Sequence, residues 1–286
     1  MNLSLMRMKR LIVNADDLGY SKEVNFQIEE CVRRGVITSS TLMANAPAFE
    51  DGVRIAKHYN QISTGVHLNL VEFKPLTNIN IFKKYGIVGD DDNFIDGAVF
   101  VKPINDELKQ AVFEEWDAQI AKIKTVGIIP SHADSHQHTH TITALQDVLC
   151  KVLEKHNISK VRRKIIPSIR IMLFRKKQAK VVLNKSSIVQ VPKRNIIYRR
   201  FHLFMVKYQS YVWNRSMNEH YNMTNAFYSF RDFYYNRSLL CLGDNKSVIE
   251  LMCHPGQKAF QHETDILIKD LSWLPNNYIM INYNQL

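Results

Sequence analysis

The sequence predicts an α/β fold with a parallel sheet, and three observations support this class. Strand-like apolar runs alternate with segments of helical periodicity, which is the order expected of βαβ units. Polar clusters follow several of the apolar runs, and in parallel α/β enzymes the active-site side chains collect at the carboxyl ends of the strands. The length of 286 residues and the hydrophobic content of 45% suit one α/β barrel with a sizeable core. We therefore treat residues 1–286 as a single domain.

In the first half of the chain, short apolar runs alternate with capped helical segments. Ser21 is placed to cap a helix, and Pro47 has the residue type favoured in the first turn of one. The expected elements, in order, are a strand at 11–13, a helix from Ser21 to Gly35, a strand from Ile37 to Met43, a helix from Pro47 to Tyr59 and a strand at 64–70.

The second half of the chain continues the alternation. A longer helix has apolar residues at near-helical spacing, and its Trp116 is expected in the core rather than in a binding site. The expected elements are a helix from Asn105 or Asp106 to Gly127, a helix from Ile142 to Lys155, a strand at 248–253, a helix from Glu263 to Trp273 and a strand from Tyr278 to Tyr283.

Carboxylates and imidazoles stand at or near the ends of four of these strands. Asp16 and Asp17 follow the first apolar run, His67 lies inside the third strand, and His254 follows Cys253. A fourth cluster, with four histidines and Asp134 in the run 131–140, follows Pro130. One Asp and two His form an ordinary ligand set for a catalytic divalent ion, whereas a structural zinc site would be closed by four ligands, usually with cysteine.

Each cluster also has a purely structural interpretation. Adjacent aspartates are common at turns and helix starts, and a single histidine such as His67 is more often a hydrogen-bonded, half-buried residue than a ligand. The histidine run is harder to explain in this way. His132, Asp134, His136, His138 and His140 share parity, so an extended backbone would project all five to one side.

Five segments carry these clusters in order: Leu11–Gly19, Gly35–Thr41, Gly65–Leu70, Asp134–His140 and Glu250–Gly256. Together they resemble the hallmark segments of the YdjC-like carbohydrate deacetylases, the group that includes the chitooligosaccharide deacetylases. The resemblance covers roughly the first 160 residues and the chain from about Ala226 onward. It implies a distorted (β/α) TIM-like barrel, related to the NodB-type polysaccharide deacetylases, with one divalent ion at its mouth.

The resemblance also implies roles for individual residues. It assigns Asp17, His67 and His136 to the metal, Asp16 to the general base and His254 to the general acid. Mg²⁺ and Zn²⁺ are the ions expected first, and Mn²⁺ or Co²⁺ would also accept oxygen and imidazole ligands. No separate organic cofactor is expected.

Other polar residues are expected to line the site without holding the ion. These are Asp134, His138, His140 and Arg162, while His132 is expected to be structural. Since adjacent side chains of a regular strand point to opposite faces, Asp16 and Asp17 can serve one site only if the chain bends there, and Gly19 makes such a bend inexpensive.

The main composition shift lies between Lys155 and Met217, where seventeen Lys and Arg residues occur without any Asp or Glu. The formal net charge of +11 is therefore concentrated in one segment. We interpret 155–235 as a basic, aromatic-rich insertion within the barrel domain. Three interpretations of residues 155–217 stay open. The segment forms a solvated basic face, it is a contact site for an anionic membrane or glycan, or it covers the substrate. Residues 169–180 have the pattern of a basic amphipathic helix.

The leading prediction is a metal-dependent hydrolase that removes acetyl from an N-acetylated amino sugar, oligosaccharide or glycoconjugate. One alternative is a metal-dependent phosphoesterase on a related barrel, although such sites usually open with paired histidines on the first strand. The other is a non-catalytic binding protein that acts through the basic segment. Nucleic acid is a disfavoured partner because no nucleic-acid module is visible, and a homodimer is kept open.

The compartment expected is the cytoplasm. The apolar run after Arg10 lasts three residues before Asn14, far short of a signal-peptide core. The four cysteines form no disulfide framework and no paired zinc spacing, which suits a reducing interior.

Overall fold

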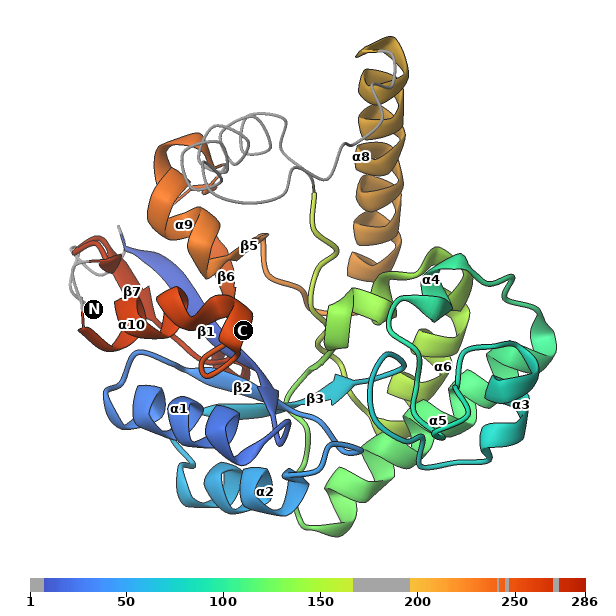
Figure 1. The fold of residues 1–286 in the computed structure, drawn as a ribbon. Coiled ribbons are helices and arrows are strands. Elements are labelled where there is room, and N and C mark those ends of the chain that lie inside the picture. The colour runs from blue at the N-terminus through green and yellow to red at the C-terminus, as the bar shows by residue number, and fades with distance from the viewer. Residues whose placement is uncertain (1–7, 167–195, 241, 245–246, 270–272) are drawn as a thin grey trace, which may run out of the picture.

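The computed structural model describes residues 8–166, 196–240, 242–244, 247–269 and 273–286, and it forms one α/β domain around a curled parallel sheet (Figure 1). The strands are β1 (Lys9–Leu18), β2 (Ser39–Leu42), β3 (Ser63–Leu68), β4 (Ala133–Ser135), β5 (Ala226–Ser229), β6 (Val248–Cys253) and β7 (Tyr278–Met280). Their order is β4-β3-β2-β1-β6-β5, and β7 pairs with the first residues of β1. All of these pairs are parallel, as the sequence predicted.

The sheet curls back on itself as a distorted TIM-like barrel. Two isolated bridges, Ala133–Val161 and Lys160–Asn222, extend the pairing from β4 toward the segment that leads into β5. Arg162 therefore follows a short strand-like segment of the barrel, residues 160–161, which lies between β4 and β5. This places its side chain among those of the regular strands.

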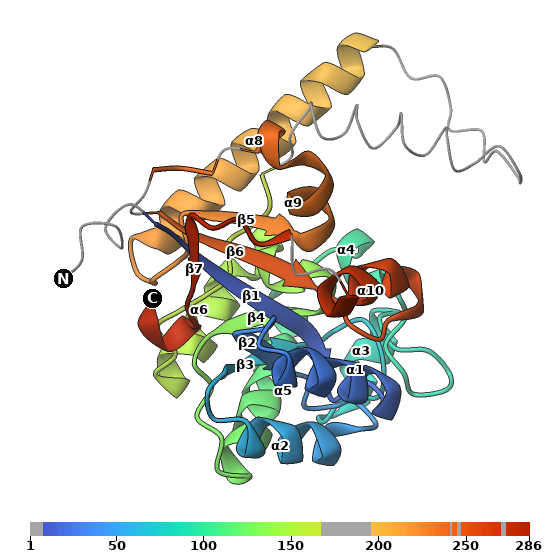
Figure 2. The same cartoon turned by 90° about the vertical axis from the view of Figure 1, so that its left-hand side faces the viewer.

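The helices are α1 (Lys22–Arg33), α2 (Phe49–His58), α3 (Ile79–Lys84), α4 (Ala98–Val101), α5 (Asp106–Thr125), α6 (Gln146–His156), α8 (Ile196–Asn218), α9 (Phe230–Asn236) and α10 (Gln261–Lys269). Apart from α8, they lie around the sheet (Figure 2). The predicted cap at Ser21 is confirmed, because its side chain accepts from the amide of Val24. At the start of α5 the Asn105 side chain accepts from the amide of Leu108. Among the described helices, none is long and apolar enough to cross a membrane.

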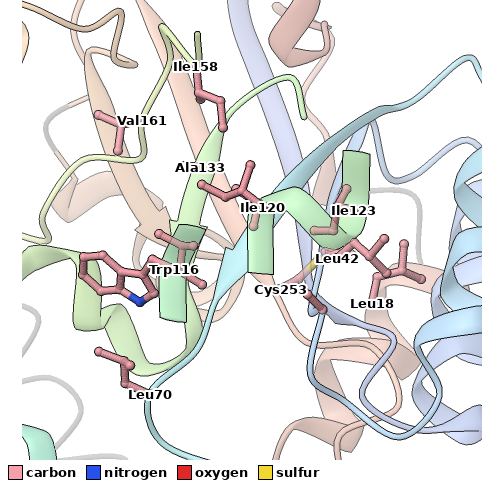
Figure 3. Packing of buried hydrophobic residues seen from close by; sticks show 14 of the residues in the cluster. Leu18, Leu42, Leu70, Trp116, Ile120, Ile123, Ala133, Ile158, Val161 and Cys253 are labelled. Atoms are coloured by element: carbon pink, nitrogen blue, oxygen red, sulfur yellow. The ribbon is translucent and has the colours of Figure 1, made fainter. Parts of the chain in front are cut away.

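The apolar core lies between the sheet and its helices. Figure 3 shows Trp116, Ile120 and Ile123 of α5 packed with residues of the strands and their connections. Trp116 is fully buried, which confirms its expected place in the core. Leu18, Leu42 and Cys253 belong to the same cluster.

The other face of the sheet, which lines the barrel interior, is mainly polar. Alternation along β1 places Leu11, Val13 and Ala15 in the core, so Asn14 and Asp16 project to the opposite side. A small apolar cluster of Ile12, Val248, Ile281 and Tyr283 lies near the start of these strands. This cluster closes the barrel at the amino ends of β1 and β6, and the polar interior opens at their carboxyl ends.

The prediction of an extended histidine run is wrong beyond Ser135. Strand β4 ends there, and His136–Thr141 forms a 3-10 segment in which Gln137 and His138 have φ of 50° and 60°. A helical turn does not keep the alternation of a strand, so parity cannot decide which histidine faces the site.

Helix α8 stands out from the body of the molecule (Figures 1 and 2). The predicted amphipathic helix at 169–180 lies outside the described residues. The assignment of 155–235 as an insertion stays a prediction.

Candidate metal centre and active site

Asp17, His67 and His136 meet at the carboxyl edge of the sheet. Asp17 lies near the end of β1, His67 lies in β3, and His136 follows β4. The register between β1 and β2 shifts between Ala15 and Leu18, and Asp17 has a φ of 70°. The chain therefore bends at Asp17 itself, so the side chains of both Asp16 and Asp17 come close to His67. This is the bend that the sequence required.

One oxygen of Asp17 faces both imidazoles. Its Oδ1 lies 3.1 Å from Nε2 of His67 and 2.8 Å from Nδ1 of His136. Its other oxygen, Oδ2, accepts a 2.8 Å hydrogen bond from the Gln257 amide. The ligand atoms of Asp17, His67 and His136 all lie within 4.8 Å of one another, so these side chains could hold a metal ion.

The far nitrogen of each imidazole has a carboxylate partner. Nδ1 of His67 lies 2.7 Å from Oδ1 of Asp134, and Nε2 of His136 lies 3.8 Å from Oε1 of Glu72. Metal-binding histidines are commonly oriented by such partners, which fix the ring and its tautomer. The donor set and its surroundings therefore fit a divalent ion.

A second group, Asp16, His67 and Asp134, also has its ligand atoms within 4.8 Å. Both of its carboxylates contact the Arg162 guanidinium, at 2.6 Å from Asp16 and 2.7 Å from Asp134. Since that cation already occupies their oxygens, this group is a poor choice for an ion.

The negative charge around the two imidazoles keeps them protonated in the metal-free protein. Burial alone would lower the pKa of His67, but Asp134 and Asp17 raise it to about 10. Burial is likewise outweighed at His136, where Asp17 and Glu72 raise the pKa to about 9. Burial would raise the pKa of Asp17, but its hydrogen bonds with His136 and His67 bring it well below the ordinary value. In the absence of a metal, protons therefore supply the positive charge at this site.

Asp16 is held by a buried arginine. Arg162 donates to both oxygens of Asp16, through Nη1 at 2.6 Å and Nη2 at 2.7 Å. Burial alone would raise the pKa of Asp16, yet the charge and hydrogen bonds of Arg162 place it far below its ordinary value. Asp16 is thus an ionised, rigidly oriented carboxylate beside the candidate ligands.

The remaining histidines of the run at 131–140 take different places. His132 stacks on Tyr283 with ring centroids 3.5 Å apart, in keeping with the expected structural role. His140 lies between the Ser135 hydroxyl and the Arg162 carbonyl. Nδ1 of His138 is buried without a hydrogen-bond partner among the described residues, and its ring makes a T-shaped contact with Phe227.

Burial keeps these three rings neutral. It lowers the pKa of His138 to about 3 and brings those of His132 and His140 well below the ordinary value, with the Arg162 charge acting in the same direction at each. His138 and His140 therefore lie beside the charged centre as neutral groups.

His254 lies after β6, with its ring stacked on Phe260 at 4.3 Å. Its Nδ1 is 3.8 Å from the buried Glu263 carboxylate. Burial would lower the pKa of His254, but Glu263 together with the charges of Asp16 and Asp17 raises it. The raised pKa favours the protonated imidazole, which can donate a proton to a departing group.

Sequence reasoning missed Glu72, Gln257 and Glu250. Glu250 is fully buried in an apolar strand, and this placement of a charged residue could have drawn attention to it. Glu72 and Gln257 lie in connections, where nothing in the local pattern distinguishes them from solvated residues.

Comparisons with known proteins agree with this architecture. The family model described as YdjC-like protein matches residues 10–275. The carbohydrate deacetylase of Clostridium beijerinckii is 34% identical over 150 residues, which cover 52% of this chain and 58% of that protein. The carbohydrate deacetylase of Brevibacillus brevis is 36% identical over 153 residues, which cover 52% and 57%. The matched segment thus spans little more than half the length of these relatives.

A solved structure from Enterococcus faecalis V583, provisionally named a cellobiose-phosphate cleavage protein, matches the fold of this chain. The TM-score is 0.69, with 97% of this chain and 98% of that one covered and 22% sequence identity. At this identity the likeness concerns the fold alone.

Proposed function

Because the chain belongs to the YdjC-like family, we propose that it is a metal-dependent hydrolase that removes the acetyl group from an N-acetylated amino sugar, oligosaccharide or glycoconjugate. The observation that carries the proposal is the cluster of Asp17, His67 and His136 beside the ionised Asp16. The carbohydrate substrate is proposed from the relatives described as carbohydrate deacetylases.

Asp17, His67 and His136 would hold the divalent ion, with Oδ1 of Asp17, Nε2 of His67 and Nδ1 of His136 as the donor atoms. When bound, the ion supplies Lewis-acid polarisation of the amide carbonyl and of the attacking water. Binding requires both imidazoles to lose a proton, because a protonated ring has no free lone pair.

Asp16 would accept the proton of the attacking water. Its carboxylate is ionised and fixed by Arg162, so it is preorganised for this role. Its pairing with Arg162 also weakens it as a base, and the water must therefore be made more acidic by the ion. His254, whose pKa is raised, would then donate a proton to the departing amine.

The test is acetate release from a panel of N-acetylated oligosaccharides and glycolipid precursors. The protein is stripped with a chelator and then given Mg²⁺, Zn²⁺, Mn²⁺ or Co²⁺ singly. Acetate release that disappears with the metal and returns with one ion supports the proposal. Release of phosphate from phosphorylated sugars without any acetate would replace it by the phosphoesterase alternative.

The basic segment gives a second proposal, which concerns a partner. We propose that α8 contacts an anionic lipid surface. Its Phe204, Tyr208 and Tyr211 are 56% to 63% exposed and follow one another at helical spacing, while Trp213 and Met217 on the other side are buried. The segment from Lys155 to Met217 has no acidic residue to oppose a negative surface. Exposed rings beside cations are typical of helices that lie at a lipid interface.

Vesicle co-sedimentation tests this contact. The protein should bind vesicles that contain phosphatidylglycerol and not pure phosphatidylcholine, and the change of Phe204, Tyr208 and Tyr211 to Ser should weaken binding at least about tenfold. Phe100→Ser with Val101→Ser is the matched control, because these residues are also exposed. Equal binding to both vesicles, or an α8 variant that only changes the oligomeric state, would contradict a lipid contact.

A further inference from the structure

A chain of buried polar groups leads from Asp16 to the C-terminal segment. Arg162 donates through Nε to Oε1 of Glu250 at 2.7 Å, while its two terminal nitrogens hold Asp16. The hydroxyl of Tyr283 donates to the other oxygen of Glu250, Oε2, at 2.6 Å. Each oxygen of Glu250 thus has one partner, and Tyr283 supplies one of the two.

Every member of this chain is buried. Arg162, Glu250 and Tyr283 are 0% exposed, and Asp16 is 2% exposed. Water cannot take the place of a missing partner in such surroundings, so each hydrogen bond constrains the next group. Asp134 adds a further carboxylate at 2.7 Å from Arg162, so one guanidinium contacts three carboxylates.

The geometry of arginine makes Glu250 important for Asp16. A guanidinium is planar, and its donors form a fixed fork. When Glu250 holds Nε, the plane of the group is set, and both terminal nitrogens face Asp16. The orientation of the Asp16 carboxylate is therefore determined from the opposite end of the arginine.

Tyr283 is itself held on three sides. Its ring stacks on His132 at 3.5 Å with planes 8° apart. Its amide donates to the Ser63 hydroxyl at 3.0 Å, and its carbonyl accepts from Nζ of Lys160 at 2.5 Å. Tyr283 lies beyond residues 10–275 that the family model matches, so the family resemblance did not point to it.

We propose that Tyr283 is a positioning residue for Asp16, which acts through Glu250 and Arg162 to keep the carboxylate aimed at the attacking water. The expected effect of Tyr283 on turnover rests on the proposed function, whereas its expected effect on the orientation of Arg162 does not. In the described part of the chain Tyr283 contacts Glu250, Ser63, Lys160 and His132, none of which is a candidate ligand, so it should affect kcat and leave KM and metal affinity unchanged.

The test uses Tyr283→Phe, which removes the hydroxyl and keeps the ring on His132. The control is Tyr278→Phe, which removes a phenol hydroxyl from the same C-terminal part of the chain. Glu250→Gln and the double variant Tyr283→Phe/Glu250→Gln complete a double-mutant cycle. All proteins are assayed with metal bound, at a temperature at which circular dichroism shows that they are folded. A second measurement follows the Nε–H signal of Arg162 by NMR in arginine-labelled protein.

Tyr283→Phe should lower kcat about tenfold with KM within about twofold, and the double variant should lose no more than Glu250→Gln alone. The Arg162 Nε–H signal should shift in Tyr283→Phe and not in Tyr278→Phe. An unchanged signal, a kcat within about twofold of the wild type, or losses that multiply in the double variant would overturn the inference. If the wild type releases no acetate, or Asp16→Asn keeps its rate, the proposed function fails instead, and the NMR signal still decides whether Tyr283 orients Arg162.

Discussion

At the scale of single residues, the neighbours Asp16 and Asp17 have different surroundings. Asp17 faces two imidazoles, and Asp16 faces a guanidinium. The imidazoles beside Asp17 can lose their protons, and a metal ion can then take the place of those protons. The guanidinium beside Asp16 stays charged, so Asp16 keeps a permanent cation as its partner. We therefore propose that Asp17 serves metal binding and Asp16 serves proton transfer.

The first prediction concerns this division. Asp16→Asn should retain the metal, because the three candidate ligands are unchanged, and should lose acetate release by about 10³-fold through the loss of the base. Metal content and turnover are measured on the same preparation. A variant with near-normal turnover would remove Asp16 from the role of base.

The second prediction concerns the protons held by the candidate ligands. The pKa values of His67 and His136 are raised to about 10 and about 9, so both rings are protonated at pH 7 before a metal binds. Zn²⁺ binding at pH 7 should therefore release about two protons, and the affinity should rise with pH up to about 10. Calorimetry in buffers of different ionisation enthalpy measures the number of protons released. Heat that is independent of the buffer would contradict it, and His67→Ala should abolish the binding itself.

The residue scale also shows the limits of sequence-based prediction. The sequence could group the Asp and His clusters because the carboxyl ends of parallel strands meet at one edge of a sheet. The choice of Asp17, His67 and His136 among them came from the family resemblance. Glu250 and Tyr283 could not be grouped with Arg162, because their contact depends on the curvature of the barrel and on the path of the C-terminal segment.

At the scale of elements, strand β3 fits closely against the segment before β4. A Cβ added to Gly65 would lie 2.5 Å from Cε1 of His132 and 2.7 Å from the His132 carbonyl. Glycine in this strand thus leaves room for the His132 ring that stacks on Tyr283. Helices α1, α2, α5, α6 and α10 lie close to where the sequence predicted them, because caps and apolar spacing are local. Helices α3, α4, α8 and α9 and strand β5 were not predicted, and the close approach of Gly65 and His132 is a tertiary property.

The third prediction follows from that contact. Gly65→Ala should lower the free energy of unfolding by about 1–3 kcal/mol, because the added methyl must displace His132 or the backbone. Gly89→Ala is a control on the surface, where the nearest atom is a flexible Asp91 oxygen at 3.1 Å. Urea unfolding compares the two variants, and equal stability of Gly65→Ala and the wild type would show that the strand can shift without cost.

At the scale of the whole molecule, the barrel interior combines ionised groups with neutral histidines. His138 has a pKa lowered to about 3, and His132 and His140 are lowered as well, so these rings stay neutral in the folded protein. An unfolded chain would protonate them near pH 6.5. The acid stability of the fold therefore depends on the same residues that surround the candidate site.

The fourth prediction is the resulting pH dependence. Between pH 6.5 and about 4.5 the unfolded state binds protons that the folded state does not, so the free energy of unfolding should fall as the pH falls. His67 and His136 act in the opposite direction in the metal-free protein, and their contribution should be lost as the pH rises through about 9 and 10. Urea unfolding at a series of pH values measures the free energy of unfolding in both pH ranges. A free energy of unfolding that stays constant from pH 6.5 to 4.5 would contradict the neutral state of the buried rings.

The measurement that tests the metal centre most directly is anomalous X-ray diffraction from crystals soaked in Zn²⁺. The arrangement of Asp17, His67 and His136 predicts one anomalous peak about 2.0–2.2 Å from an oxygen of Asp17, Nε2 of His67 and Nδ1 of His136. A crystal with no peak there, or with the ion bound only by other residues, would contradict the proposed centre.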